Sequence, residues 1–485
     1  MKYVLAHDFG TSADKAALFT VEGELAGSCS MSYPTIYREG DQVEQDAHTW
    51  WKAFCDGSKK LLHSIDPADV ICVSFDGASP NCLCVDKDLQ PLHKTMIWQD
   101  NRASLEAEEI SALLPEKYLK KHPKHKVSTD RTLAKLLWVK KHQPEVFEKT
   151  WKVLPCVPNY IVMRLTGRVV CDYGVARTTA MLDADNRDWA DEILEIAGIP
   201  RKILPELMDR TGIAGVVPET MSEACGLAPG TPIVVGTIDN ACTQIGAGIL
   251  RPGDIFIIGG TSASVEGLDN QGGRIGKPTS ASGASLNWAK NQLCEMEQLL
   301  AEQMKENVFD VMNREIEASP VGSNGVIFHP YMAGARSVLD NPYAKGAFLG
   351  LSLTNTRSDM LRSVVEGIGF NLNLILQSIR DTGVTVTRMP IVGGLGNGAV
   401  VRQIFADIMD VELVTHENMD VSTAVGAAVL GGIALGLYEN ESTVERFIRV
   451  KDVTRPIPEN VEKYRQIAAL FRELYDRMVP VYDKM

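Results

Sequence analysis

A carboxylate, a Gly-Thr-Ser turn and a lysine lie close together near the start of the chain. Residues 8–12 read Asp-Phe-Gly-Thr-Ser, follow an apolar run, and are followed by Lys15. Glycine lets backbone N–H groups turn toward an anion, hydroxyls add donors, and lysine supplies a mobile positive charge. Asp8 would repel bare phosphate but suits the water shell of Mg²⁺. The combination is typical of a site that holds a magnesium-bound phosphate.

The same turn recurs far along the chain. Residues 259–262 read Gly-Gly-Thr-Ser and again follow an aliphatic run, at 255–258. Either turn alone is ordinary chemistry at the end of a strand. Two copies in similar surroundings favour one phosphate-binding unit built twice, and therefore an internal duplication of the chain.

Asp239 is the candidate for proton transfer. It lies in the sequence Gly-Thr-Ile-Asp-Asn at 236–240, directly after the apolar strand candidate 233–235. Such a carboxylate can accept the proton of an attacking alcohol. Asp is equally common as the residue that caps a helix after a strand, and the residues alone leave both roles open.

Polar and glycine-rich segments elsewhere add candidates for binding. Trp98, Asp100 and Arg102 form a Trp-x-Asp-x-Arg string that could meet sugar hydroxyls; a solvated Asp-Arg ion pair beside a core tryptophan is the alternative. Residues 393–398 read Gly-Gly-Leu-Gly-Asn-Gly after the strand candidate 391–392. Glycine clusters of this kind serve tight packing as well as nucleotide binding, and this spacing differs from a dinucleotide fingerprint.

Composition narrows the classes of partner. The chain has 485 residues, 45% hydrophobic residues, a formal net charge of −13 and a pI near 5.3. An acidic protein of this kind argues against nucleic acid and anionic membranes as partners. The ten scattered cysteines lack the spacing of a zinc or redox site, and charged residues come too early for a signal peptide, so we expect a cytoplasmic protein. The uncharged run 422–438 is too short to span a membrane comfortably and predicts a buried helix.

The pattern of elements is α/β. The sequence predicts a hairpin over 3–24 and strands at 70–75, 82–85, 233–235 and 255–258, with helices at 132–141, 359–380 and 400–409. Alternating strands and helices favour mixed sheets covered by helices. The breakers at 251–254 mark a domain junction, which gives an N-terminal domain over 1–250 and a C-terminal domain over 251–485.

The order of motifs along nearly the whole chain resembles the FGGY carbohydrate kinases, and among them the xylulokinase-like branch. The motifs are DFGTSADK at 8–15, IWQDNR at 97–102, LTGRVVCD at 165–172, GTIDNA at 236–241, GGTSAS at 259–264, FHPYMAGAR at 328–336, DNPYAKGAFLGLS at 340–352, the helix 359–367 and GGLGNG at 393–398. The resemblance implies a two-domain actin-like (ribonuclease H-like) ATPase fold, with duplicated mixed β-sheet domains and an interdomain cleft that closes to exclude water.

The resemblance also assigns roles. It implies ATP and Mg²⁺ as ligands, Asp239 as the catalytic base and Asp8 as a ligand of Mg²⁺ through water. The residues that it assigns to the nucleotide are Gly10, Thr11, Ser12, Lys15, Gly260, Thr261, Gly393, Gly394, Asn397 and Gly398. Those on the sugar side are Ala78, Ser79, Asp100, Arg102, Asp239 and Asn240.

Two departures concern the sugar. Xylulokinases usually have Gly-Gln-Met-His where residues 77–80 read Gly-Ala-Ser-Pro, and Gly-Glu-Arg is replaced by Gly-Ala-Arg at 334–336. Because sites discriminate through such polar groups, their loss alters which acceptor fits. Asp76 and Ser79 are candidates to compensate. A ketopentose such as D-xylulose, giving the 5-phosphate, is the favoured acceptor, and another ketose or a polyol stays open.

Two other classes of protein share part of this motif pattern. An actin-like filament protein or chaperone ATPase would keep the phosphate turns but lack the Trp-x-Asp-x-Arg string and the second family signature, and a sugar sensor would be expected to lose Asp8 or Asp239. All of these features are present. We therefore expect a carbohydrate kinase whose partners are a small sugar and ATP, with neither nucleic acid nor membrane. A homodimer is compatible with the family.

Overall fold

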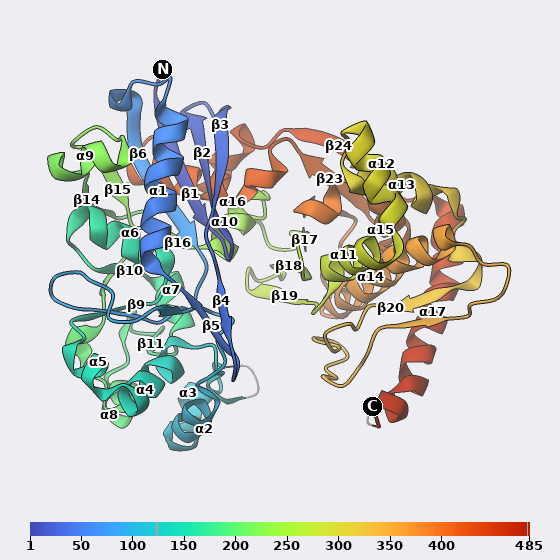
Figure 1. The fold of residues 1–485 in the computed structure, drawn as a ribbon, viewed down its shortest axis with the longest axis horizontal. Helices are drawn as coiled ribbons and strands as arrows, with labels where there is room; N and C mark the ends of the chain where they lie inside the picture. Colours follow the sequence, from blue (N-terminus) through green and yellow to red (C-terminus); the bar gives the residue numbers. More distant parts are fainter. Residues whose placement is uncertain (123–124, 483) are drawn as a thin grey trace. The chain divides into compact units, whose positions relative to one another are not determined.

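The computed structural model describes residues 1–122, 125–482 and 484–485, which divide into two compact units (Figure 1). Unit 1 comprises residues 1–248 and 421–447, and unit 2 comprises residues 249–420 and 448–485. The first junction lies beside the position expected near residue 250. Segment 421–447 differs from that expectation, since it packs in unit 1 instead of continuing the second half of the chain.

Unit 1 is built on a seven-stranded mixed sheet in the order β14-β15-β6-β1-β2-β3, with β16 also paired to β6. The strands are β1 (Tyr3–Phe9), β2 (Ala13–Thr20), β3 (Leu25–Ser32), β6 (Val70–Gly77), β14 (Ile213–Val216), β15 (Pro232–Val234) and β16 (Thr237–Ile238). The first three form an antiparallel meander, and β1 pairs in parallel with β6. The predicted hairpin and the predicted strands at 70–75 and 233–235 are therefore confirmed.

Unit 2 repeats this arrangement. Its six-stranded sheet has the order β19-β18-β17-β22-β23-β24. The strands are β17 (Ile255–Gly259), β18 (Ala263–Leu268), β19 (Arg274–Pro278), β22 (Arg388–Val392), β23 (Glu412–His416) and β24 (Val450–Thr454). Again three strands form an antiparallel meander whose first strand, β17, pairs in parallel with the next, β22. The duplicated mixed sheets predicted from the two Gly-Thr-Ser turns are confirmed.

Helices cover these sheets, and smaller strands complete each unit. In unit 1 the helices are α1 (Ala47–Leu62), α2 (Ser104–Leu113), α3 (Glu116–Leu119), α4 (Thr132–His142), α5 (Pro144–Lys149), α6 (Val157–Thr166), α7 (Tyr173–Thr178), α8 (Asp191–Ala197), α9 (Glu219–Cys225), α10 (Asp239–Gly246) and α16 (Ser422–Ala434). In unit 2 they are α11 (Ser282–Leu293), α12 (Glu295–Met304), α13 (Val308–Ala318), α14 (Arg357–Arg380), α15 (Ala399–Met409) and α17 (Pro458–Tyr482). The smaller strands are β4 (Ile36–Arg38), β5 (Gln42–Gln45), β7 (Leu83–Val85), β8 (Thr95–Met96), β9 (Lys152–Leu154), β10 (Val170–Asp172), β11 (Leu182–Asp183), β12 (Asp188–Trp189), β13 (Glu206–Met208), β20 (Ile327–His329) and β21 (Ala347–Leu349).

The uncharged run near the C-terminus forms the buried helix α16, as predicted. This helix packs against β1, β6 and α10, all in unit 1. The packing is close because α16 is rich in small residues: a Cβ added at Gly426 would lie 2.1 Å from the carbonyl oxygen of Cys242 on α10. No helix in the described residues is long and apolar enough to cross a membrane.

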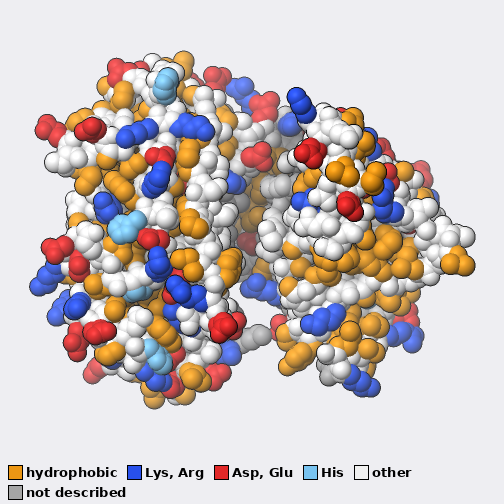
Figure 2. Space-filling model, in the orientation of Figure 1, with side chains coloured by type: hydrophobic (Ala, Val, Ile, Leu, Met, Phe, Trp, Pro, Cys, Tyr) orange, Lys and Arg blue, Asp and Glu red, His pale blue; other side chains and the backbone are white. Residues whose placement is uncertain are grey.

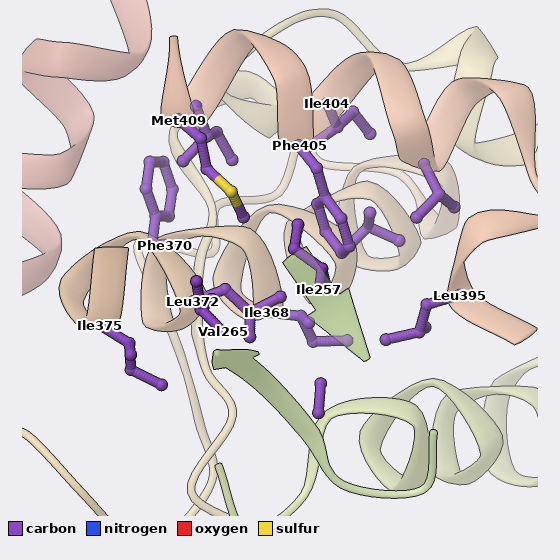
Figure 3. Close-up of a cluster of buried hydrophobic side chains, with 14 of the residues drawn as sticks. Ile257, Val265, Ile368, Phe370, Leu372, Ile375, Leu395, Ile404, Phe405 and Met409 are labelled. Atoms are coloured by element: carbon purple, nitrogen blue, oxygen red, sulfur yellow. The ribbon is translucent and has the colours of Figure 1, made fainter. Parts of the chain in front are cut away.

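The core of unit 2 lies between its sheet and helices α14 and α15. Figure 3 shows Ile257 of β17, Ile368 and Phe370 of α14, and Phe405 and Met409 of α15 converging in one cluster. All five side chains are almost completely buried. Burying each such side chain contributes about 1.5–3 kcal/mol to folding. On the face shown in Figure 2, acidic and basic side chains are intermixed on the surface of each unit.

Candidate active site

Three carboxylates gather at one edge of the unit 1 sheet. Asp8 on β1 is the register partner of Asp76 on β6, and Asp76 is also the register partner of Thr237 on β16. Asp239 follows β16 directly as the first residue of α10. Because the three strands run parallel, their carboxyl ends bring Asp8, Asp76 and Asp239 to the same edge.

Asp8 and Asp76 form a close carboxyl pair. Burial raises the pKa of Asp8 to about 6, although Lys15 opposes the rise. Burial and the negative charges of Asp8 and Asp239 raise the pKa of Asp76 well above its usual range. Both oxygens of Asp76 are buried without a donor among the described residues. A proton shared between Asp8 and Asp76 accounts for this arrangement, and a bound cation would satisfy it equally.

The loop before Asp239 is shaped by a glycine. Gly236 has φ +77°, and a Cβ there would lie 2.2 Å from the carbonyl oxygen of Phe75 on β6. Thr237 then donates to the carboxylate of Asp172 over 2.8 Å. Asp239 is half-buried and accepts the backbone N–H of Asn240 at 2.6 Å, while the Asn240 side chain is exposed. Asp239 thus lies inside the first turn of α10, and Ile238 occupies the capping position proposed for it as the alternative role.

The first predicted phosphate turn, residues 10–12, is fixed by hydrogen bonds to its backbone carbonyls and also has an exposed side chain. The hydroxyl of Tyr33 donates to the carbonyl oxygen of Gly10, and the side-chain amide of Gln45 donates to that of Thr11 over 2.6 Å. Ser12 is exposed. Lys15, also exposed, is the register partner of Asp8 across the β1–β2 hairpin. The structure therefore brings the predicted Asp8 and Lys15 together beside this turn.

The second phosphate turn lies in unit 2 and is exposed. Gly260, Thr261 and Ser262 follow β17, and the carbonyl oxygens of Gly260 and Thr261 accept the backbone N–H groups of Gly283 and Ala284 at 3.2 and 2.9 Å. Neither Gly10 nor Gly260 has a positive φ, so neither turn depends on the wider backbone freedom of glycine. Both turns leave their strands without a left-handed residue.

The glycine-rich segment 393–398 adjoins the second turn, because β22 pairs in parallel with β17. Gly393 has φ +89°, and a Cβ there would lie 2.7 Å from the carbonyl oxygen of Gly259. Gly394 faces open space. Farther along, the buried guanidinium of Arg402 donates to the carbonyl oxygens of Gly396 and Asn397 at 2.7 and 3.0 Å. The residues predicted to bind the nucleotide in unit 2, including Asn397 and Gly398, are thus brought into one loop cluster.

Asp100 and Arg102 are paired inside unit 1. The guanidinium of Arg102 donates to both Asp100 oxygens at 2.7–3.0 Å and to Glu44 at 2.8 Å. Only 5% of the Arg102 side chain is exposed, and Asp100 is fully buried and also accepts the backbone N–H of Val43. The Asp-Arg ion pair is present, buried instead of solvated. Contact of either residue with sugar stays a prediction.

Trp98 is exposed and Ser79 is half-buried. The Trp98 side chain is 39% exposed, and its indole N–H donates to the hydroxyl of Thr11 at 3.1 Å. Ala78 is buried, and its N–H donates to the carbonyl oxygen of Phe9. The Ser79 hydroxyl contacts that of Thr178 at 2.7 Å. The sugar-side and phosphate-side segments of unit 1 therefore share direct contacts.

The sequence motifs predict Asp76 only as a substitute sugar contact, and they assign no site role to Tyr33, Gln45 or Arg402. A usable signal existed for Asp76, because it follows the buried strand residues 70–75 just as Asp8 follows its own apolar run. Tyr33 and Gln45 act on loop carbonyls 23 and 34 residues away, and Arg402 reaches back along the chain to its own loop. Their roles depend on tertiary contacts that no local pattern announces.

The carboxyl pair of Asp8 and Asp76 suits a partly hydrated Mg²⁺ and not a metal ion that is enclosed by protein ligands alone. No group of three or more His, Cys, Asp or Glu side chains in the described ranges forms a complete metal site. Mg²⁺ usually keeps several waters and takes one or two carboxylates together with phosphate oxygens. Asp8 with Asp76, whose buried oxygens have no donor, meets that requirement.

Comparisons with known proteins agree along the chain. Residues 3–246 match the N-terminal domain, and residues 266–435 the C-terminal domain, of the FGGY family of carbohydrate kinases. The xylulose kinase of Bacillus subtilis is 29% identical over 98% of this chain and 97% of its own, and the gluconokinase of the same organism is 27% identical over 97% and 95%. The crystal structure of a ligand-bound xylulose kinase from Lactobacillus acidophilus superposes with a TM-score of 0.86, at 25% identity over the full length of both chains.

Proposed function

The chain belongs to the FGGY family of carbohydrate kinases and is a phosphotransferase, and we propose from this premise that its acceptor is a ketopentose such as D-xylulose. ATP is the phosphoryl donor and the 5-phosphate is the product. The similarity to a xylulose kinase supports this choice. A comparable similarity to a gluconokinase makes D-gluconate the second candidate.

The position of Asp239 is the observation that carries the proposed phosphoryl transfer to a sugar hydroxyl. It lies at the start of α10, at the sheet edge shared with Asp8, and its negative charge bears on the adjacent Asp76. Phosphoryl transfer to an alcohol needs a group that accepts the hydroxyl proton and holds the acceptor in line. Asp239 accepts that proton at a carboxylate oxygen, late in the transfer, because a sugar hydroxyl has a high pKa. Orienting the hydroxyl is its larger contribution.

The other predicted site residues either offset the charge of ATP or position it. Thr11, Ser12 and Thr261 donate hydroxyl hydrogens to phosphate oxygens, and Lys15 offsets negative charge. Asp8, through water, and Asp76 would hold Mg²⁺. When bound, the ion neutralises charge on the phosphates of ATP. The segment 393–398 binds the adenosine moiety. Gly394 leaves room for it, because nothing lies within 4 Å of a Cβ built at that position.

An acceptor screen tests the proposal. ADP release is measured with Mg-ATP and D-xylulose, other pentuloses, hexuloses, polyols and D-gluconate. We expect D-xylulose to give the highest kcat/KM. A higher value for D-gluconate would establish the second candidate instead, and assembly of filaments with ATP but without sugar-stimulated ADP release would contradict both.

A further inference from the structure

Lys135 lies on α4 with a completely buried side chain. Lysine is almost never fully buried unless its charge is paired. Here the ammonium group donates to two backbone carbonyl oxygens, that of Pro80 at 3.1 Å and that of Ile97 at 2.6 Å. A buried cation is therefore directed at two loops that lie 55 and 38 residues before it in the sequence.

Both loops are sugar-side segments. Pro80 ends the segment 78–80, where the chain departs from the usual xylulokinase residues, and Ile97 immediately precedes the string 98–102. Lys135 thus joins the two predicted sugar-contacting segments through a single charged group.

Two neighbours reinforce the same connection. Thr132, one turn before Lys135 on α4, donates its hydroxyl to the carbonyl oxygen of Asn81 at 2.8 Å. The Asn81 side chain donates to the carbonyl oxygen of Ala78 at 3.0 Å and accepts the backbone N–H of Trp98 at 3.2 Å. Helix α4 consequently determines the separation of the two segments at several points.

We propose that Lys135 is a positioning residue for the sugar acceptor, which holds segments 78–80 and 98–102 in the arrangement that binds the sugar without touching the sugar itself. The inference rests on the proposed function, because that function places the sugar against these segments. A hydrogen bond from a charged group is stronger than one from a neutral donor, so the ammonium suits two carbonyls that must stay fixed.

Helix α4 also supplies a matched control. Lys140 lies on the same helix and likewise donates to two backbone carbonyl oxygens, those of Ala197 and Gly198, at 3.1 and 2.9 Å. These carbonyls lie at the C-terminal end of α8, outside the sugar-side segments. Lys140→Met removes a comparable clamp, so it separates a general loss of stability from loss of sugar positioning.

The pKa of Lys135 offers a second measurement. Burial lowers it to about 8; Cys82, Asp130 and Asp100 oppose the shift, and Arg102 adds to it. As pH rises through 8, the neutral amine becomes a weaker donor to the two carbonyls. We expect the KM for sugar of the wild type to rise over this range, and that of Lys135→Arg, which keeps its charge, to stay level.

The experiment compares the wild type, Lys135→Met, Lys135→Arg and Lys140→Met, with D-xylulose and D-gluconate as acceptors. We expect Lys135→Met to raise the KM for the accepted sugar roughly 10-fold or more, the effect of losing hydrogen bonds from a charged group. The KM for Mg-ATP should rise less than the KM for sugar, because the held segment reaches the first Gly-Thr-Ser turn only through the bond from Trp98 to Thr11. The ATP hydrolysis without sugar should stay near wild type. Lys135→Arg should recover part of the loss, and Lys140→Met should leave the KM for sugar unchanged.

The outcomes that overturn the inference are distinct from failure of the proposed function. If the wild type shows no sugar-stimulated ADP release with any acceptor, the proposed function fails and the inference fails with it. If the wild type is active and folded Lys135→Met has a normal KM for sugar, the inference alone fails. Should Lys135→Met not fold, the wild type and Lys135→Arg provide the test, and a KM for sugar that shows the same pH dependence through about pH 8 in both proteins would overturn the inference.

Discussion

The indole N–H of Trp98 donates a hydrogen bond to the side-chain oxygen of Thr11 at 3.1 Å. Trp98 belongs to the sugar-side string, and Thr11 belongs to the first phosphate turn. Because the Thr11 oxygen accepts this bond, its own hydrogen is left to point elsewhere, toward a phosphate oxygen. One contact therefore orients a predicted phosphate donor from the sugar side of unit 1.

Trp98→Phe removes the N–H and keeps an aromatic ring. We expect the KM for Mg-ATP to rise about 2–10-fold, the effect of one net hydrogen bond, with little change in the KM for sugar. Trp98→Ala should raise both KM values, because the ring surface is lost as well. Steady-state kinetics with each substrate varied in turn measures the difference. An unchanged KM for Mg-ATP in Trp98→Phe would show that the bond does not orient Thr11.

Asp239→Asn tests the base directly. The amide keeps the size of the side chain but cannot accept the proton of the sugar hydroxyl, so we expect turnover to fall roughly 100-fold or more. Fold and ADP binding should be retained, as checked by circular dichroism and calorimetry. Asp191→Asn is the matched control, because Asp191 is likewise the first residue of a helix, α8, and lies away from the site. Near-normal turnover in Asp239→Asn would refute its assignment as the base.

Much of the candidate site could be predicted because its signals are local. Each phosphate turn follows a strand whose apolar run is visible in the sequence, and the uncharged run 422–438 contains the buried helix α16. The predicted Asp239 does follow a strand end. Local patterns of this kind depend only on neighbours in the chain, so they can be recognised without knowledge of the fold.

The rest depends on partners distant in sequence. Arg102 was expected to meet either a sugar or solvent, and its burial follows from Glu44 and from the Trp138 ring, 5.0 Å from its guanidinium carbon. The placement of segment 421–447 in unit 1 likewise follows from the packing of its helix α16 on β1 and β6. Such contacts become visible only when the sheet order is known.

Asp76→Asn should stabilise the protein at neutral and alkaline pH in the absence of metal and nucleotide. The pKa values of Asp8 and Asp76 are raised in the folded state, so their contribution to stability is present below about pH 4 and is lost as pH rises through about 6 and above. An amide in place of Asp76 removes the repulsion and can donate to Asp8. We expect a gain on the order of 1–3 kcal/mol at pH 8.

The measurement is the Tm of wild type and Asp76→Asn between pH 5 and pH 8. The gain should grow with pH over this range. Asp88→Asn, at an exposed position in the same unit, should show no such trend and serves as the control. A variant that is less stable than the wild type at pH 8 would contradict the carboxyl pair.

Arg402→Met should weaken the binding of the nucleotide and leave the binding of the sugar unchanged. Its guanidinium holds the carbonyl oxygens of Gly396 and Asn397 within the glycine-rich segment, so its loss should loosen that segment and raise the KM for Mg-ATP about 10-fold. The KM for sugar should change little. Arg380→Met is the matched control, since Arg380 also donates to backbone carbonyls of unit 2, those of Met409, Val386 and Asp410, outside the segment. Equal effects of the two variants on Mg-ATP would mean that Arg402 stabilises unit 2 as a whole and does not shape the nucleotide loop.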